Sequence, residues 1–374
     1  MYLTAATGVE QAKANPFSRW ARSCASWLEA HPRSVVAVFS AAYFAVTAYQ
    51  ANLKPLWNDE FFTFYIAQAG FQRGWQILLT GADQHPPTFY WLTRVFLWVF
   101  GSDPVVVRLP ELIGFWLMLI CLFVVTARKT TNLIGYFIML FPLSTPLYYY
   151  AFEARGYALL LGSAAAAYLF WEDASAGRYR KISVPLFAFF ITASVCSHYY
   201  GILIMIPFAM AEIVRFYTRR KPDQLLWAAF AAPIVPLFAF LPVIQAARAY
   251  STDFWGQPSL RGIDDAFSLV CGAPTVFFIS IATIVLLYYI VVRPEITMPR
   301  RLSSRESGLA LPQLTATIGF VALPVFGYLL ASFVTHAYAP RYMIQCAIGV
   351  EIVAATLLSI VCKNYRVLQL AIIV

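Results

Sequence analysis

The sequence predicts an all-α, polytopic integral membrane protein. Of its 374 residues, 60% are hydrophobic and only 12% are charged, which is typical of membrane-embedded helices and not of soluble domains. Many of its apolar runs are long enough to cross a hydrocarbon core of roughly 30 Å. The six cysteines are scattered, mostly inside apolar runs. The sequence therefore indicates neither a disulfide framework nor a zinc site.

Ten apolar runs are candidate spans, so we expect about 10–11 transmembrane helices. They cover residues 34–53, 107–127, 132–150, 157–171, 182–199, 201–216, 225–245, 266–292, 311–334 and 342–362. The first 33 residues are polar and mixed in charge, which is too long a lead for a signal peptide. We expect residues 1–33 to be a cytoplasmic segment and residues 34–374 to be one transmembrane domain.

The apolar segment 88–100 is shorter than a span. At about 1.5 Å per residue it reaches only about 20 Å, so we expect it to lie along the membrane surface within a first outer loop, residues 54–106. The basic residues support this arrangement. With the N-terminus inside, most of the 27 Lys and Arg residues fall on the inner side, and the outer side holds Lys54, Arg73, Arg94, Arg108, Arg155, Arg248, Arg261 and Arg341. If the segment crossed, the later basic loops would lie outside, against the positive-inside rule.

The formal net charge of +9 does not predict a nucleic-acid partner. The basic runs Arg219-Arg220-Lys221 and Arg300-Arg301 are expected to face anionic lipid at the inner surface. After Lys363 and Arg366 an apolar run, 367–374, ends short of a span. We expect a truncated chain that lacks a further helix or a C-terminal soluble outer domain.

Under this topology, acids, imidazoles and arginines from distant segments gather on the outer side. The set consists of Asp59, Glu60, Asp83, His85, Asp103, Arg108, Glu111, Glu153, Arg155, His198 and Arg341. At headgroup depth, such a set suits a lipid-phosphate substrate. Transfer of a sugar from a polyprenyl phosphate needs a carboxylate to take the acceptor proton and a fixed positive charge for the departing phosphate. Asp59 suits the first role, and Arg341 or Arg155 the second, because guanidinium binds phosphate through paired donors.

Six motifs in order also resemble those of the GT-C glycosyltransferases. They are Trp-Asn-Asp-Glu at 57–60, Asp-Gln-His-Pro-Pro-Thr-Phe-Tyr-Trp-Leu at 83–92, Gly-Ser-Asp at 101–103 with Arg-Leu-Pro at 108–110, Phe-Glu-Ala-Arg-Gly-Tyr at 152–157, Ser-His-Tyr-Tyr at 197–200 and Pro-Arg-Tyr at 340–342. The nearest branch is that of the protein O-mannosyltransferases, the aminoarabinose lipid A transferases and related bacterial sugar transferases.

The resemblance implies a multi-span fold and a polyprenyl-phosphate sugar donor. It also implies an active site on the periplasmic face of a bacterial inner membrane and a catalytic acid in the first outer loop. Carried onto this sequence, that acid is Asp59, with Glu60 beside it. The expected substrate-binding residues are Asp83, His85, Arg108, Glu153, Arg155, His198 and Arg341. Many members carry a C-terminal outer domain that is absent here, so the acceptor (lipid, glycan or protein) is not predicted.

A simpler structural role is open for each of these residues. Asp59 and Glu60 also fit the capping positions of a helix, and His85 before two prolines fits a rigid turn.

The remaining site residues fit simple roles as well. Glu153 and Arg155 fit a surface pair, Arg108 and Glu111 fit a pair one helical turn apart, and Arg341 fits a snorkelling anchor. A lone histidine such as His198 is often a hydrogen-bonded structural group.

Two other functions are open besides sugar transfer to an acceptor hydroxyl. A transporter or flippase would place its binding groups near the midplane in repeated halves, whereas here they collect at the rim and no repeat is visible. A noncatalytic member of the fold would tolerate loss of Asp59. No cofactor is certain, and the outer carboxylates leave a divalent cation open.

Overall fold

The computed structural model describes residues 16–249, 256–272 and 309–362, which form helices and connecting loops without any strand. The all-α prediction is confirmed for these residues. The first 15 residues, most of the expected span 266–292, the basic pair Arg300-Arg301 and the C-terminal run 367–374 lie outside the described residues.

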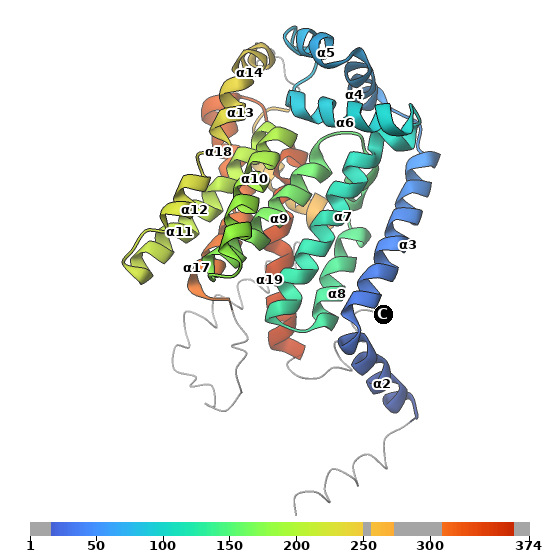
Figure 1. Cartoon of the computed structure of the whole chain (residues 1–374), viewed down its shortest axis with the longest axis vertical. Coiled ribbons are helices and arrows are strands. Elements are labelled where there is room, and N and C mark those ends of the chain that lie inside the picture. The colour runs from blue at the N-terminus through green and yellow to red at the C-terminus, as the bar shows by residue number, and fades with distance from the viewer. Residues whose placement is uncertain (1–15, 250–255, 273–308, 363–374) are drawn as a thin grey trace, which may run out of the picture.

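Upright helices form the body of the molecule (Figure 1). They are α2 (Pro16–Ala30), α3 (Pro32–Leu53), α7 (Pro104–Lys129), α8 (Asn132–Leu140), α9 (Tyr157–Ser175), α10 (Arg180–Ser197), α11 (Met205–Arg219) and α19 (Ala347–Cys362). Short 3-10 segments connect or extend them: η1 (Phe141–Ser144), η2 (Pro146–Phe152), η3 (Tyr199–Ile204) and η6 (Pro340–Cys346). The remaining described elements are α12 (Gln224–Ala229), α13 (Ile234–Ala239), α14 (Leu241–Arg248), α15 (Leu260–Cys271), α17 (Leu311–Val321), α18 (Leu323–Leu330) and the π-helical η5 (Ala331–Thr335).

Within the described ranges, five helices are long and apolar enough to cross a membrane, or seven if each of two bent pairs is one span. The bends, of 64° before α14 and 52° before α18, follow a break of a few residues. A proline stands in the first turn after each break, Pro242 and Pro324. The proline ring and its missing N–H interrupt helical hydrogen bonding, which explains the bends. The count is below the expected ten in part because the predicted span 132–150 is a short apolar helix, 132–144, that gives way to 3-10 turns. The composition and fold are those of an integral membrane protein.

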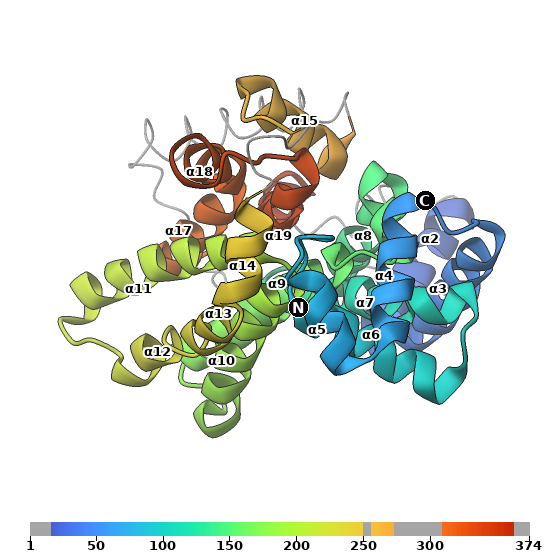
Figure 2. The same ribbon diagram turned by 90° about the horizontal axis from the view of Figure 1, so that it is seen from above.

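The first loop covers one end of this bundle. It consists of α4 (Asn58–Ala69), α5 (Phe71–Leu78) and α6 (Pro87–Phe100). In Figure 1, α6 lies across the ends of the upright helices instead of alongside them, and seen from above α4–α6 lie over α7 and α3 on one side, opposite α10–α12 (Figure 2). That segment 88–100 does not cross the membrane stays a prediction. Gly101, at a φ of 92°, turns the chain into α7.

The centre of the bundle is the contact between α7 and α9. A Cβ atom added to Gly114 would lie 2.6 Å from the carbonyl oxygen of Ala158, and Ala164–Ala167 in α9 are buried. Small residues let helix backbones approach closely, which is the usual way helices pack in a membrane. The contact fixes the start of α9, and the loop before it, beneath α4–α6.

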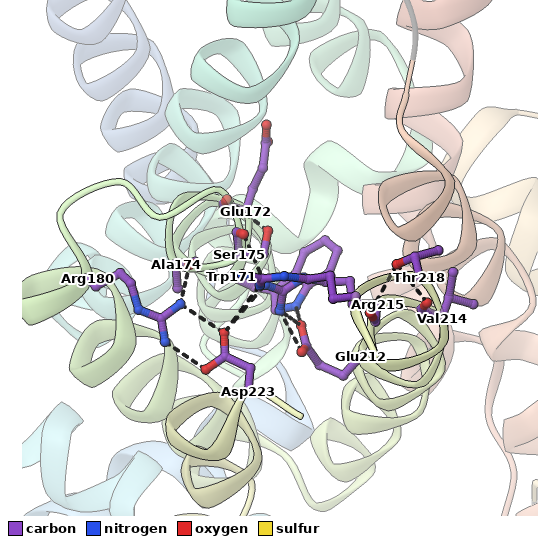
Figure 3. Close-up of polar contacts among 11 residues, drawn as sticks. Trp171, Glu172, Ala174, Ser175, Arg180, Glu212, Val214, Arg215, Thr218 and Asp223 are labelled. Atoms are coloured by element: carbon purple, nitrogen blue, oxygen red, sulfur yellow. Dashed lines mark hydrogen bonds and ion pairs between the residues drawn. The ribbon is translucent and has the colours of Figure 1, made fainter. Parts of the chain in front are cut away.

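A cluster of ion pairs lies at the opposite end of α9, and we call it the far cluster (Figure 3). Arg180 donates to both oxygens of Asp223 at 2.7 and 2.8 Å. Arg215 donates to Glu212 at 2.6 Å, and Glu212 also accepts the Trp171 indole N–H at 2.7 Å. The cluster is completed by Arg128 and Arg178 on Asp173 and by Lys129 on Glu172. These contacts join the ends of α7, α9, α10 and α11.

Candidate active site

A cavity of about 520 Å³ opens at the end of the bundle covered by α4–α6. Its walls come from α4, the α5–α6 loop, the loop before α9, the α10–η3 junction, α13–α14 and η5–η6. Of the predicted site residues, those that line it are Asp59, Asp83, His85, Arg155, His198 and Arg341. Glu60, Arg108 and Glu153 do not.

Asp59 and Arg341 face each other in this cavity. Asp59 lies in the first turn of α4 and Arg341 in the first turn of η6. An Nη atom of Arg341 is 3.9 Å from a carboxylate oxygen of Asp59, and the side chains are 22% and 31% exposed. The two groups that sequence analysis chose for base and phosphate ligand are therefore on the same side of the molecule. Their contact is longer than a hydrogen bond, so a ligand atom can compete for either group.

Asp83 and Arg155 form a closed, buried pair. The two Nη atoms of Arg155 donate to the two Asp83 oxygens at 2.5 and 2.9 Å, and Asp83 also accepts the Gln84 N–H at 2.7 Å. Burial alone would raise the pKa of Asp83, but the adjacent guanidinium holds it well below its usual range. Arg155 also donates to the Asp59 carbonyl at 3.2 Å. The predicted Glu153–Arg155 pair is absent, and Arg155 instead ties the α5–α6 loop to α4.

His85 and His198 meet at the inner wall of the cavity. Their ring centroids are 5.1 Å apart and nearly perpendicular, and the residues are 3% and 5% exposed. Burial lowers the pKa of His85 to about 4 and that of His198 well below its usual range, so both rings are neutral near pH 7. His85 also occupies the turn before α6, so its structural and cavity roles coexist.

The hydrogen bonds of the two rings differ. Nδ1 of His198 accepts the Tyr200 N–H at 3.2 Å, so its neutral ring carries the proton on Nε2. Neither His85 nitrogen has a hydrogen-bond partner within the described structure, and Nδ1 lies 3.6 Å from Oδ1 of Asp83.

Glu60 and Arg108 are fully buried and bind each other outside the cavity. The guanidinium donates to the two Glu60 oxygens at 2.8 and 2.6 Å. Glu60 also accepts the N–H of Ala154 at 2.8 Å and that of Trp57 at 3.4 Å. The last contact caps α4, as the capping interpretation expected for Glu60. Arg108 also donates to the Lys54 carbonyl at 2.6 Å. The pair locks the end of α3 to α4 and α7.

The expected pair between Arg108 and Glu111 does not form. Glu111 instead accepts the N–H groups of Ala158 and Leu159 at 2.7 and 3.1 Å. Its carboxylate thus satisfies donors in the first turn of α9, where the N-terminal N–H groups have no partner within the helix.

Glu153 lies behind the cavity wall. It is 1% exposed, and neither carboxylate oxygen has a hydrogen-bond partner among the described residues. Burial raises its pKa to about 7 against the opposing charges of Lys54 and Arg341. Burial also lowers the pKa of Lys54, whose Nζ is 4.1 Å from the centroid of the Tyr149 ring.

Sequence analysis missed several cavity residues: Tyr157, Tyr199, Tyr200, Tyr342 and Arg248, with the apolar Leu237, Ile244 and Val334. All four tyrosines stood in the quoted motifs, but tyrosines at span ends are also typical of interfacial belts, so composition alone did not identify them as cavity residues. Across residues 16–249, 256–272 and 309–362, no group of three or more His, Cys, Asp or Glu residues is arranged to hold a metal ion.

The sequence and the fold of this chain are similar to those of known proteins. Residues 84–245 match the family model described as dolichyl-phosphate-mannose-protein mannosyltransferase. A search of curated proteins finds no match. The structure of ArnT from Cupriavidus metallidurans bound to undecaprenyl phosphate is similar at a TM-score of 0.59 and 20% identity, over 87% of this chain and 60% of ArnT. The apo structure of ArnT gives 0.56 and 19% over 88% and 60%.

The chain thus spans about 60% of the length of ArnT, and at this identity the likeness concerns the fold. The resemblance predicted from the six motifs is confirmed: the chain has the fold of ArnT and, over residues 84–245, matches the family model of the dolichyl-phosphate-mannose-protein mannosyltransferases.

Proposed function

We propose that this protein is a membrane glycosyltransferase that moves a sugar from a polyprenyl-phosphate donor to an acceptor hydroxyl. The observation that carries the proposal is the pairing of Asp59 with Arg341 across a cavity at the covered end of the bundle. The mannosyltransferase family match and the undecaprenyl phosphate bound to ArnT support the donor class.

In this mechanism Asp59 is the general base. Its carboxylate takes the proton of the acceptor hydroxyl while the oxygen attacks the anomeric carbon of the sugar. The bond between that carbon and the phosphate oxygen breaks, and the polyprenyl phosphate leaves with the electron pair. Asp59 suits this step because it is partly exposed to the cavity and its ion pair with Arg341 is long, at 3.9 Å.

Arg341 is the group that stabilises the leaving phosphate. Its guanidinium lines the cavity opposite the base, and a fixed cation there lowers the energy of the charge that develops on the phosphate. Arg155 was an equal candidate in the sequence. Because both of its Nη atoms are bound to Asp83, we assign it the positioning of Asp59 and of the α5–α6 loop.

Glu60 and Arg108 also act at a distance, by fixing the start of α4 and so the direction of Asp59. Glu153 lies behind Arg341 and Lys54, and we assign it the tuning of their field instead of contact with substrate.

The apolar side of the cavity suits the polyprenyl tail. Leu237, Ile244 and Ala247 of α13–α14 and Val334 of η5 form this side, and the chain bends by 64° between α13 and α14. The far cluster gathers basic side chains at the opposite end, as the positive-inside rule expects of a cytoplasmic face. We therefore place the cavity on the periplasmic side.

The test is sugar transfer by the purified protein in nanodiscs with radiolabelled polyprenyl-phosphate sugars. We expect Asp59→Asn to lower turnover by about 10²- to 10⁴-fold while donor binding stays close to wild type, because shape is kept and only the charge is lost. Asp264→Asn, an exposed acid on α15, is the matched control. If Asp59→Asn turns over as fast as wild type, Asp59 is not the general base.

A further inference from the structure

The inner wall of the cavity is aromatic and uncharged. The His85 and His198 rings pack on Tyr157 at centroid distances of 5.5 and 5.6 Å, and Tyr342 lies 4.7 Å from His198. All four residues line the cavity and are at least nine-tenths buried. This wall offers flat apolar faces together with a few polar ring atoms.

His85 brings buried polar atoms that the protein does not satisfy. Neither ring nitrogen has a hydrogen-bond partner in the described part of the chain. Nδ1 has only the 3.6 Å contact with Asp83, and a buried polar group without a partner destabilises a fold. A neutral imidazole has one donor and one acceptor, and a sugar hydroxyl supplies the complement of each.

The charged groups around this wall leave no carboxylate for a cationic sugar. Asp83 has both oxygens on Arg155, and Asp59 faces Arg341 and is needed for the acceptor. Among the described lining residues, the arginines (Arg155, Arg248 and Arg341) outnumber these two aspartates. A protonated amine placed here would be buried without a partner, which is strongly unfavourable.

We propose that His85 and His198 form the subsite of the donor sugar and select an uncharged sugar by hydrogen bonds between the imidazoles and its hydroxyls. His85 presents a nitrogen acceptor and donor, and His198 presents its Nε2–H, while the apolar face of the sugar ring packs on Tyr157 and Tyr342. The inference rests on the proposed function and adds the residues and charge class of its substrate.

The experiment compares two donors on the same polyprenyl phosphate, a neutral hexose and the same hexose with one hydroxyl replaced by an amine, in binding and in transfer. We expect wild type to use the amino sugar at least about tenfold less well. His85→Phe keeps the ring and removes its nitrogens, so it should lower kcat/KM for the neutral donor by about 10- to 100-fold. His85→Gln, which retains a donor and an acceptor, should recover most of this loss.

Two further comparisons separate substrate contact from a purely structural effect. His31→Phe is the control, because His31 stacks on Trp27 at the other end of α3. A series of neutral donors, each lacking one hydroxyl, locates the hydroxyl that His85 binds. For the donor that lacks this hydroxyl, wild type and His85→Phe should have the same kcat/KM. Equal use of all donors by wild type and His85→Phe, or preference for the amino sugar, overturns the subsite while the transferase stands. Failure of wild type to bind or transfer either donor overturns the proposed function and the subsite together.

Discussion

The two ends of α9 use the same kinds of side chain for different results. In the far cluster every acid is held by at least one cation, as when Asp223 binds Arg180 and Arg215, and Glu212 binds Arg215 and the Trp171 indole. At the cavity end, His85 and Glu153 are buried without hydrogen-bond partners in the described structure. Buried polar groups are nearly always paired. The comparison teaches that each acid of the far cluster has a cation to hold it, although one oxygen of Glu172 accepts no hydrogen bond, whereas His85 lines a cavity where a ligand can supply the missing partner.

The largest loss of stability is expected for the buried pair of Glu60 and Arg108 at the cavity end. Glu60→Ala removes the partner of a fully buried guanidinium, and such a loss typically lowers the free energy of unfolding by about 3–5 kcal/mol. Thermal unfolding in nanodiscs measures it. Glu60→Gln can still accept hydrogen bonds, so its unfolding temperature should lie between those of wild type and Glu60→Ala. If Glu60→Ala is as stable as wild type but inactive, Glu60 belongs to the chemistry and not to the frame.

Glu153 predicts a pH dependence of stability. Because burial raises its pKa to about 7 from an unfolded value near 4.3, the folded state binds more protons between these values. The contribution of Glu153 to the free energy of unfolding is then largest below about pH 4 and falls as the pH rises to about 7, by about 4 kcal/mol at most. The charge of Glu60 raises the pKa of Glu153 further, whereas three cations lower it: Lys54, Arg341 and Arg155.

Glu153→Gln should remove this slope. Unfolding of wild type and variant at pH 5 and pH 8 tests it, with the exposed Asp264→Asn as the control that keeps the wild-type slope. An unchanged slope in Glu153→Gln would show that the pKa of Glu153 does not differ between the folded and unfolded states.

Arg341 and Arg180 form a matched pair for comparing the two ends. Arg341→Ala should weaken binding of polyprenyl phosphate by about 2 kcal/mol, the usual size of a hydrogen bond to a charged group, with little loss of stability. Arg180→Ala breaks two short bonds to Asp223 and should lower the unfolding temperature without changing lipid binding. Isothermal titration measures the affinity of each variant for polyprenyl phosphate, and thermal unfolding measures the stability of each. The comparison fails if the two variants behave alike.

Sequence reasoning found six of the seven charged or imidazole residues that line the cavity, because motifs in chain order mark the ends of elements. Asp59, Asp83, His85, Arg155, His198 and Arg341 were chosen in this way, and all line the cavity. It did not separate Asp59 from Glu60, since neighbouring residues on a helix point in different directions, and only the fold shows Glu60 turned toward Arg108. It paired Arg108 with Glu111 by helical spacing, whereas the desolvated guanidinium took a carboxylate 48 residues away. Arg248 and the tyrosines were missed because their types are also usual at membrane interfaces.

The smallest effect is expected at the edge of the far cluster. Arg178 is 44% exposed and binds Asp173 at 2.7 Å, which Arg128 also binds at 2.8 Å. An exposed pair is worth about 0.2–1 kcal/mol, and here a second cation remains. Arg178→Ala should therefore change unfolding by less than about 1 kcal/mol and leave transfer unchanged. A loss as large as that of Glu60→Ala would show that the far cluster depends on one contact, and that Arg128 alone does not hold Asp173 in place.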